Sequence, residues 1–254
     1  MTIYTPELPE IAQTFVNVTF PAKVTIRSTL SIIDKIKSIL SKEFQNEFRR
    51  WPQLGRLLDL PTTGKFCGTL AHQLLLRRIK CKKYKEIWFL LNGKPLRFSL
   101  NEFVLITGLY TKGTPSEKKI AAQKKNNRLI NKYWSNRRGV TVDDVYTTLH
   151  ELQSANTDDR VKLAFVYLLT GFLLARDSKT AIPTWIFSFA DDLKFFDKFP
   201  WGKICYNHLI EILTGLDMEG KFKDRPGRKD DKSPSQYNIL CCPWILQVSF
   251  DKLA

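Results

Sequence analysis

Apolar residues recur at helical spacing between residues 31 and 50, and this pattern predicts a long amphipathic helix. Residues three or four positions apart share one side of a helix, so such a stripe can be buried while the opposite side meets water. Pro52 limits the helix, because proline has no backbone N–H to donate. The stripe consists of Ile32, Ile33, Ile36, Ile39, Leu40, Phe44 and Phe48.

Two more helical segments are predicted before residue 83. Residues 54–60 form a short helical turn that Pro61 ends, and residues 69–82 form a longer helix. The longer helix has a basic C-terminal end, which suits the negative end of the helix dipole. Its inward residues are Leu70, Leu74, Leu75 and Ile79.

The most specific local pattern covers residues 86–98 and predicts a β-hairpin. Two apolar runs flank Asn92-Gly93, a pair that favours a two-residue hairpin turn. Ser99 then begins a helix, and Glu102 three residues later completes a capping box. The apolar side of this helix is assigned to Phe103, Leu105 and Ile106, and its end to Gly108.

Helical spacing dominates the rest of the chain. Helices are predicted over residues 141–153, 158–175, 183–198 and 204–213. Residues 111–138 are predicted to be a basic insert or linker. If residues 116–133 are helical, one side carries Lys124, Lys125, Arg128 and Lys132, and the other carries Leu129, Ile130, Tyr133 and Trp134. A disordered loop is the alternative for the first half of the insert.

These elements predict a mainly α fold, a helical domain with one small β-hairpin that leads into a capped helix. Residues 1–28 are expected to be an extended lead-in, and residues 29–216 the helical domain with its insert at 111–138. Residues 217–254 are expected to be a charged loop followed by a C-terminal segment that is truncated.

The charge of the chain is concentrated in three segments. The 254 residues carry 40 Lys and Arg against 25 Asp and Glu, a formal charge of +15. Residues 77–86 have six bases against one acid (+5), residues 112–138 have nine against one (+8), and residues 221–232 have six against three (+3). The remainder is therefore close to neutral, at −1. Such clusters attract polyanions, although they are also typical of solvated surfaces and import signals.

Nucleic acid or chromatin is accordingly one candidate partner. The side chains expected to contact phosphates are Arg77, Arg78, Lys82, Lys83, Lys124, Lys125, Arg128 and Lys132. Aromatic residues beside these bases could stack on unpaired bases, or they could be ordinary core residues. These aromatic residues are Tyr84, Trp88, Tyr133 and Trp134.

Catalytic and metal-binding patterns are missing from the sequence. The five cysteines include no CxxC pair, the three histidines lie far apart, and no phosphate-binding loop, dinucleotide fingerprint or HExxH motif occurs. We therefore predict a protein without enzymatic activity, cofactor or metal site. The longest uncharged apolar run, residues 163–175, is too short to cross a membrane, and no secretion signal is recognised.

Several segments, taken in order, resemble a plant domain of unknown function that is abundant in the mustard family. The resemblance covers roughly residues 45–215, and its most specific part is residues 86–109, which read EIWFLLNGKPLRFSLNEFVLITGL. Members of that family often precede a SUMO-protease domain in genes derived from Mutator-like transposons. The resemblance implies a transposon-derived plant protein that is nuclear, or otherwise cytoplasmic. The protease's own Asp-Cys-Gly motif is missing here.

Two binding hypotheses and one enzymatic one make different structural predictions. A nucleic-acid-binding module predicts that residues 77–86 and 112–138 converge on one face, with Tyr84 or Tyr133 exposed. A protein-interaction or scaffold domain associated with a SUMO-protease predicts dispersed basic segments and an exposed apolar patch. A peptidase-related enzyme predicts a Cys and a His close together in a cleft.

Overall fold

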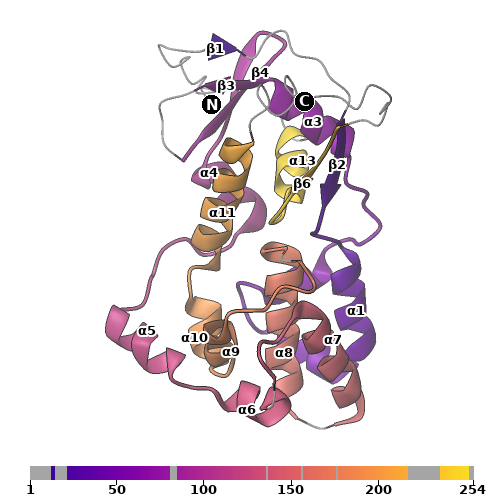
Figure 1. Cartoon of the computed structure of the whole chain (residues 1–254), viewed down its shortest axis with the longest axis vertical. Coiled ribbons are helices and arrows are strands. Elements are labelled where there is room, and N and C mark those ends of the chain that lie inside the picture. The colour runs from indigo at the N-terminus through magenta and orange to yellow at the C-terminus, as the bar shows by residue number, and fades with distance from the viewer. Residues whose placement is uncertain are drawn as a thin grey trace.

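The computed structural model describes residues 13–14, 22–80, 85–135, 137–155, 157–175, 177–216 and 235–251. Figure 1 shows an elongated molecule with strands gathered at one end and helices at the other. The described residues are mainly helical, which confirms the predicted fold class. One apolar core runs through both ends, and it includes Ile33, Phe48, Phe89, Phe165 and Leu213.

The strands form two small sheets. The first has the antiparallel order β1-β3-β4-β5, and the second pairs β2 with β6 in parallel. The predicted hairpin is confirmed as β4 and β5, with Asn92 and Gly93 at positive φ in its turn. The strand bounds are β1 Gln13–Thr14, β2 Ala22–Ile26, β3 Arg78–Lys80, β4 Ile87–Leu91, β5 Lys94–Phe98 and β6 Ser235–Ile239.

Up to Thr107, the described residues include four α-helices and one 3₁₀ helix. The predicted capping box is present at the start of α4, and Gly108 ends that helix in the left-handed conformation at φ 56°. The 3₁₀ helix η1 is the short turn expected over residues 54–60. The bounds are α1 Ser31–Ile39, α2 Lys42–Arg49, η1 Gly55–Asp59, α3 Gly68–Leu76 and α4 Leu100–Thr107.

The described helices after Thr107 include the two insert helices and the helices of the helical end. Helix α8 continues into a π-helical segment, η3, and together they match the predicted 158–175 helix. The bounds are α5 Glu117–Lys124, α6 Arg128–Trp134, α7 Val142–Glu151, η2 Leu152–Ser154, α8 Asp159–Leu168, η3 Leu169–Leu173, α9 Thr184–Ala190, α10 Leu193–Lys198, α11 Trp201–Gly215 and α13 Trp244–Asp251.

The single helix predicted over residues 31–50 is wrong, because the chain leaves the helix at Leu40. Its backbone is extended there, at φ −78° and ψ 129°, and α2 starts anew after Ser41. The Gln45 amide donates to the carbonyls of Lys37 and Leu40, at 2.8 and 2.9 Å. These bonds satisfy backbone carbonyls that the end of α1 leaves without a partner, and they stabilise the break. The two helices on either side of the break each bury an apolar face.

The helix predicted over residues 69–82 ends six residues early. Helix α3 stops at Leu76, and the following basic residues pair with β4, placing Arg78 opposite Phe89 and Ile79 opposite Trp88. Ile79 is buried in this arrangement. Burial of Ile79 and pairing with a distant strand therefore outweigh the helical spacing of the local sequence.

Two further helices that were predicted as single elements are each divided. The 183–198 helix breaks at Asp192, whose side chain accepts from the backbone N–H groups of Lys194 and Phe195 and so caps α10. The helix predicted over residues 116–133 is instead the pair α5 and α6. Short polar side chains prefer the cap position, which explains the break at Asp192.

A buried glutamine ties the middle of the molecule together. The Gln53 amide donates to the carbonyls of Asp197 and Phe199, and its oxygen accepts from the backbone N–H of Tyr110. The backbone N–H of Gln53 also donates to the Asp197 carboxylate at 2.9 Å. This network fixes the segment before η1 against the end of α10 and the residues that follow α4.

Candidate functional site

The two described phosphate-contacting bases predicted in the first segment, Arg77 and Arg78, differ in exposure. Arg77 is exposed and donates to the backbone carbonyl and side chain of Gln73. Arg78 lies against the end of α11, where its guanidinium donates to the carbonyls of Leu213 and Leu216. Lys82 and Lys83 lie outside the described residues, as do Tyr84 and the 221–232 segment.

Arg128 in the second segment is bound by two carboxylates of the helical end. It contacts Asp159 at 2.5 Å, and its Nε lies 2.9 Å from both oxygens of Asp191. The carboxylates are buried, with side chains only 5% and 7% exposed. Lys132 and Lys162 add a second cation to Asp159 and Asp191, at 2.7 and 2.8 Å.

This cluster fixes the protonation states of its members. Burial alone would raise the pKa of Asp159, but hydrogen bonds from Arg128, Lys132 and Tyr133 outweigh it and hold that pKa well below its usual range. The pKa of Asp191 is lowered in the same way, with Lys162 among its donors. Arg128 and Lys132 thus hold the insert onto the helical end, a role that sequence reasoning missed.

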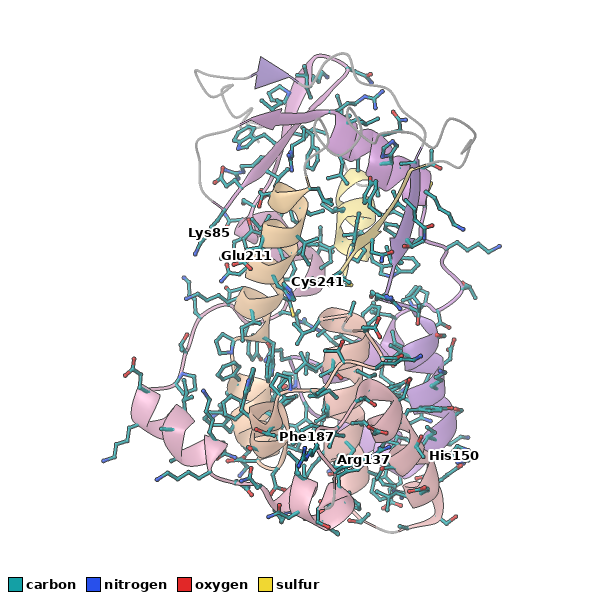
Figure 2. The ribbon with its side chains drawn as sticks, viewed as in Figure 1. Lys85, Arg137, His150, Phe187, Glu211 and Cys241 are labelled. Carbon is teal, nitrogen blue, oxygen red and sulfur yellow. The ribbon has the colours of Figure 1, made fainter. Side chains whose placement is uncertain are left out.

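Lys124 and Lys125, by contrast, are exposed at the end of α5. The described parts of the two basic segments do not converge: β3 lies at the strand end of the molecule, while α5 and α6 lie at the opposite end (Figure 1). Figure 2 shows the same separation for Lys85 and Arg137. The described bases of the two segments therefore do not form a single surface.

The described aromatic residues beside the basic segments belong to the interior or are bonded to it. Trp88 and Trp134 are buried in the core. The Tyr133 hydroxyl donates to Asp159 at 2.8 Å, and burial first, then that bond, raises its pKa. The prediction that the aromatic residues beside the basic segments are ordinary core residues is therefore confirmed for Trp88 and Trp134.

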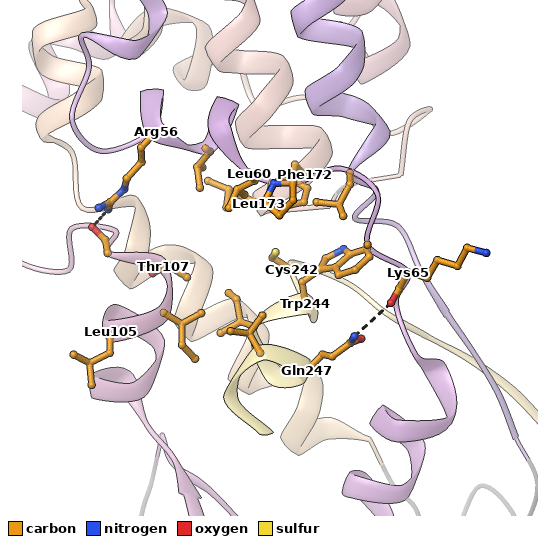
Figure 3. Close-up of a pocket in the computed structure, with 18 residues that line it drawn as sticks. Arg56, Leu60, Lys65, Leu105, Thr107, Phe172, Leu173, Cys242, Trp244 and Gln247 are labelled. Carbon is orange, nitrogen blue, oxygen red and sulfur yellow. Dashed lines mark hydrogen bonds between the residues drawn. The ribbon is translucent and has the colours of Figure 1, made fainter. Parts of the chain in front are cut away.

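A groove opens at the middle of the molecule, between its strand end and its helical end. Its volume is about 470 Å³, within the usual size range of ligand pockets. We call it the waist groove (Figure 3). Its apolar lining comes from η1 and the loop after it, α4, η3 and α13, together with the residue before α1: Leu30, Leu57, Leu60, Pro61, Leu105, Ile106, Phe172, Leu173, Trp244, Ile245 and Val248.

Hydrogen bonds between distant segments set the shape of the waist groove. The Trp244 indole donates to the carbonyl of Ser28 at 3.0 Å, fixing α13 against the segment before α1. Gln247 accepts from the backbone N–H of Cys67 at 2.9 Å and donates to the carbonyl of Lys65 at 3.4 Å. These bonds fix α13, one wall of the groove, against the segment before α1 and the loop before α3.

Large apolar side chains reach solvent at the edge of the waist groove. In the described part of the chain, three large apolar side chains are exposed, and two of them, Leu105 at 83% and Val248 at 37%, belong to this lining. Leu105 was expected on the buried side of its helix, and that assignment is wrong, because Phe103 is the residue of α4 that is buried. A leucine left on the outer side of a short helix is the sequence signal for this edge.

The charged residues that line the waist groove are all cationic. Among the described lining residues these are Arg56 and Lys65, and no carboxylate accompanies them. The Arg56 guanidinium donates to the carbonyl of Gly108 at the end of α4, and the Lys65 side chain extends away from the cavity (Figure 3). The groove therefore offers an apolar surface with positive charge at its edge.

The waist groove contains one thiol, and burial suppresses its reactivity. Desolvation raises the pKa of Cys242 to about 12, so the group stays protonated near neutral pH and is a poor nucleophile. Within the described ranges, no three His, Cys, Asp or Glu side chains converge as a metal site would require. None of the described helices combines the length and apolar character needed to span a membrane.

Comparison with known families gives one finding. Residues 75–212 match the model of a domain of unknown function, DUF1985. The match covers more than half of the chain, so the chain belongs to this family. Comparisons with curated proteins and with solved structures gave no match.

Proposed function

We propose that this member of the DUF1985 family is a non-enzymatic protein-interaction domain, and that its recognition site is the waist groove. The observation that carries the proposal is that two exposed apolar side chains, Leu105 and Val248, both lie at the edge of one apolar groove. Exposed apolar surface beside a cavity is typical of binding sites, because covering it releases water.

The shape of the groove favours a helical segment of the partner. Amphipathic helices bind by placing apolar side chains at i, i+3 and i+4 into a groove between helices. Here α4 and α13 supply two of the walls, and about 470 Å³ accommodates a few large side chains. Complete burial of a leucine or valine contributes about 1.5–3 kcal/mol, so Leu105 and Val248 are the expected anchors.

The positive charge at the edge of the waist groove favours acidic residues at the ends of the partner helix. Arg56 and Lys65 stand at the edge of the groove without a carboxylate among the described lining residues. A partner helix with glutamate or aspartate at its ends would bring opposite charges together, whereas a helix with lysines would be repelled. We therefore propose an apolar helical segment with acidic flanks as the occupant.

The proposed setting is a transposon-derived plant nuclear protein, and a SUMO-protease domain or a protein bound to it is the first partner to test. What supports this setting is the resemblance described above, carried by residues 86–109. The scaffold role agrees with the dispersal of the basic segments, because such a domain needs no single basic face.

The test uses a model peptide in place of the unidentified partner. A short helical peptide with leucines on one face and glutamates at both ends is titrated onto the full chain by fluorescence anisotropy. Leu105→Glu should weaken binding at least tenfold, because it places a carboxylate in the apolar edge. Gln153→Glu adds the same charge to an exposed position of η2, outside the lining, and it should leave binding unchanged.

Two outcomes would count against the proposal. Equal weakening by Leu105→Glu and Gln153→Glu would show that charge alone controls binding, away from the groove. Equal affinity for the peptide with glutamate ends and for a twin peptide with lysine ends would remove the assigned partner chemistry. Circular dichroism of each variant confirms that the fold is retained.

A further inference from the structure

Helix α5 presents a surface of lysines that the fold does not use. Four lysines are exposed on it or at its end, and the structure records no hydrogen bond or ion pair of their ammonium groups to any described residue. Ile120 and Gln123 are the half-buried positions, so the opposite side faces solvent. These four lysines, which we call the α5 lysines, are Lys118, Lys119, Lys124 and Lys125.

The α5 lysines are held on a fixed support. The Gln123 amide donates to the carbonyl of Ser188 at 2.9 Å, and Asn126 donates to Asp191 at 2.8 Å. Arg128 adds its contacts to Asp159 and Asp191 directly after the helix. The cations that anchor this segment are thus different from the four that remain free at its surface.

Helix stability does not account for these lysines. Lys118 and Lys119 lie in the first turn of α5, where the helix dipole is positive and disfavours cations. Lys124 and Lys125 suit the negative end of the helix, but Glu117 is the one acid in residues 112–138 that could offset the charge of the segment. The positive charge at the start of α5 therefore opposes folding slightly and indicates another use.

The exposed positions between the α5 lysines carry small side chains. Lys118 and Lys125 are two turns apart, about 10 Å along the helix axis, and Ala121 and Ala122 lie exposed between them. Methyl side chains allow the helix backbone to approach another molecule closely. Large apolar or aromatic side chains, which protein interfaces and membrane-bound helices need as anchors, are missing from the exposed positions of α5.

We propose that the α5 lysines bind the phosphate backbone of double-stranded nucleic acid without reading its sequence. Lysines on a fixed helix neutralise phosphates and release condensed counterions, which drives such binding. Duplex is favoured over single strands because the described aromatic residues of the insert do not face solvent freely: Trp134 is buried and the Tyr133 hydroxyl is bonded to Asp159. This surface lies apart from the waist groove and does not depend on the function proposed for it.

The test is a salt titration of the full chain with a fluorescent random-sequence DNA duplex. Four phosphate contacts predict a slope of about −3.6 in log K against log salt, or about a 150-fold loss between 50 and 200 mM salt. The variant carries glutamine at all four α5 lysines, which preserves helix propensity. Its affinity at 50 mM salt should fall at least tenfold, and its slope should flatten by about three to four.

A matched control separates this site from net charge. Lys23, Lys42, Lys94 and Lys179 are also exposed, so replacing all four by glutamine removes the same charge from dispersed positions. Retained binding in this control, together with its loss in the α5 variant, would support the proposal. Equal losses, no binding of the wild-type chain at 50 mM salt, tighter binding to single strands, or binding to anionic phosphatidylserine vesicles instead of duplex would each overturn it.

Discussion

Replacement of Arg128 by methionine tests whether the insert is held to the helical end by its ion cluster. Methionine keeps the length and the apolar stem of the side chain but removes the guanidinium. Asp159 and Asp191 then lose the cation that bridges them, while Lys132 and Lys162 remain as single partners. The expected result is a less stable protein with an unchanged fold.

The magnitude follows from the contacts. Hydrogen bonds to charged groups contribute about 1.5–3 kcal/mol each, and unpairing a buried charge costs about 3–5 kcal/mol. Arg128 is 43% exposed, however, and both carboxylates keep a second cation. After this discount for solvent we expect a loss of about 2–3 kcal/mol. For a chain of this size, that loss lowers Tm by about 4–12 °C.

The loss should also depend on pH. Asp159 and Asp191 have folded-state pKa values well below the usual range, whereas in the unfolded chain an Asp pKa is about 3.9. Their stabilisation is therefore complete above about pH 5 and declines as the unfolded chain takes up protons below about pH 4. Because Arg128→Met removes much of this stabilisation, the difference between variant and wild type should shrink from pH 7 to pH 3.

Urea unfolding followed by tryptophan fluorescence measures both effects, since Trp134 lies in α6 beside Phe187. The control is Arg137→Met, whose guanidinium pairs with Asp144 at the surface and should contribute less than about 0.5 kcal/mol. A loss no larger than that of the control, or a loss equal at pH 7 and pH 3, would refute the reasoning.

Two other substitutions test the fold around the groove. Gln53→Leu should destabilise the protein by about 3 kcal/mol in urea unfolding, because the carbonyls of Asp197 and Phe199 lose their buried donor; a loss below about 1 kcal/mol would contradict the network. Ser99→Ala should lower the free energy of unfolding by about 1 kcal/mol through loss of the capping box with Glu102, and unchanged stability would show that the cap contributes nothing.

Local chemistry predicted some elements of this fold well. The hairpin turn at Asn92-Gly93 and the capping box at Ser99 both follow from backbone preferences of neighbouring residues. Each signal is complete within a few positions, so no distant contact is needed to interpret it. The mainly α class followed for the same reason, from helical spacing repeated along the chain.

Local sequence patterns did not predict the elements whose bounds depend on residues far away in the sequence. Helix α3 ends early because Ile79 pairs with β4, and the break at Leu40 is stabilised by Gln45. The role of Arg128 depends on Asp159 and Asp191, which are far away in the sequence. Counting bases found the charge of the insert but did not separate anchoring cations from free ones.

The waist groove could not be predicted from the sequence either, because its walls come from segments that meet only in the folded chain. Leu105 has the apolar character of a core residue and was assigned to the apolar side of its helix, although it lies two positions after the buried Phe103 and therefore on a different side. Val248 belongs to α13, near the opposite end of the chain from the segment before α1 that also lines the groove. The expectation of an exposed apolar patch was general, and its location required the structure.

The parallel pairing of β2 with β6 has a consequence for how the chain is made. Residues 22–26 leave the ribosome roughly 200 residues before their partner, residues 235–239, is synthesised. During translation β2 therefore waits with an open edge, the kind of edge on which chains aggregate. A shorter chain limited to residues 75–212 would lack both strands and α13. Recombinant expression should therefore retain residues 22–251, so that β2 and β6 can pair and aggregation through an unpaired strand edge is avoided.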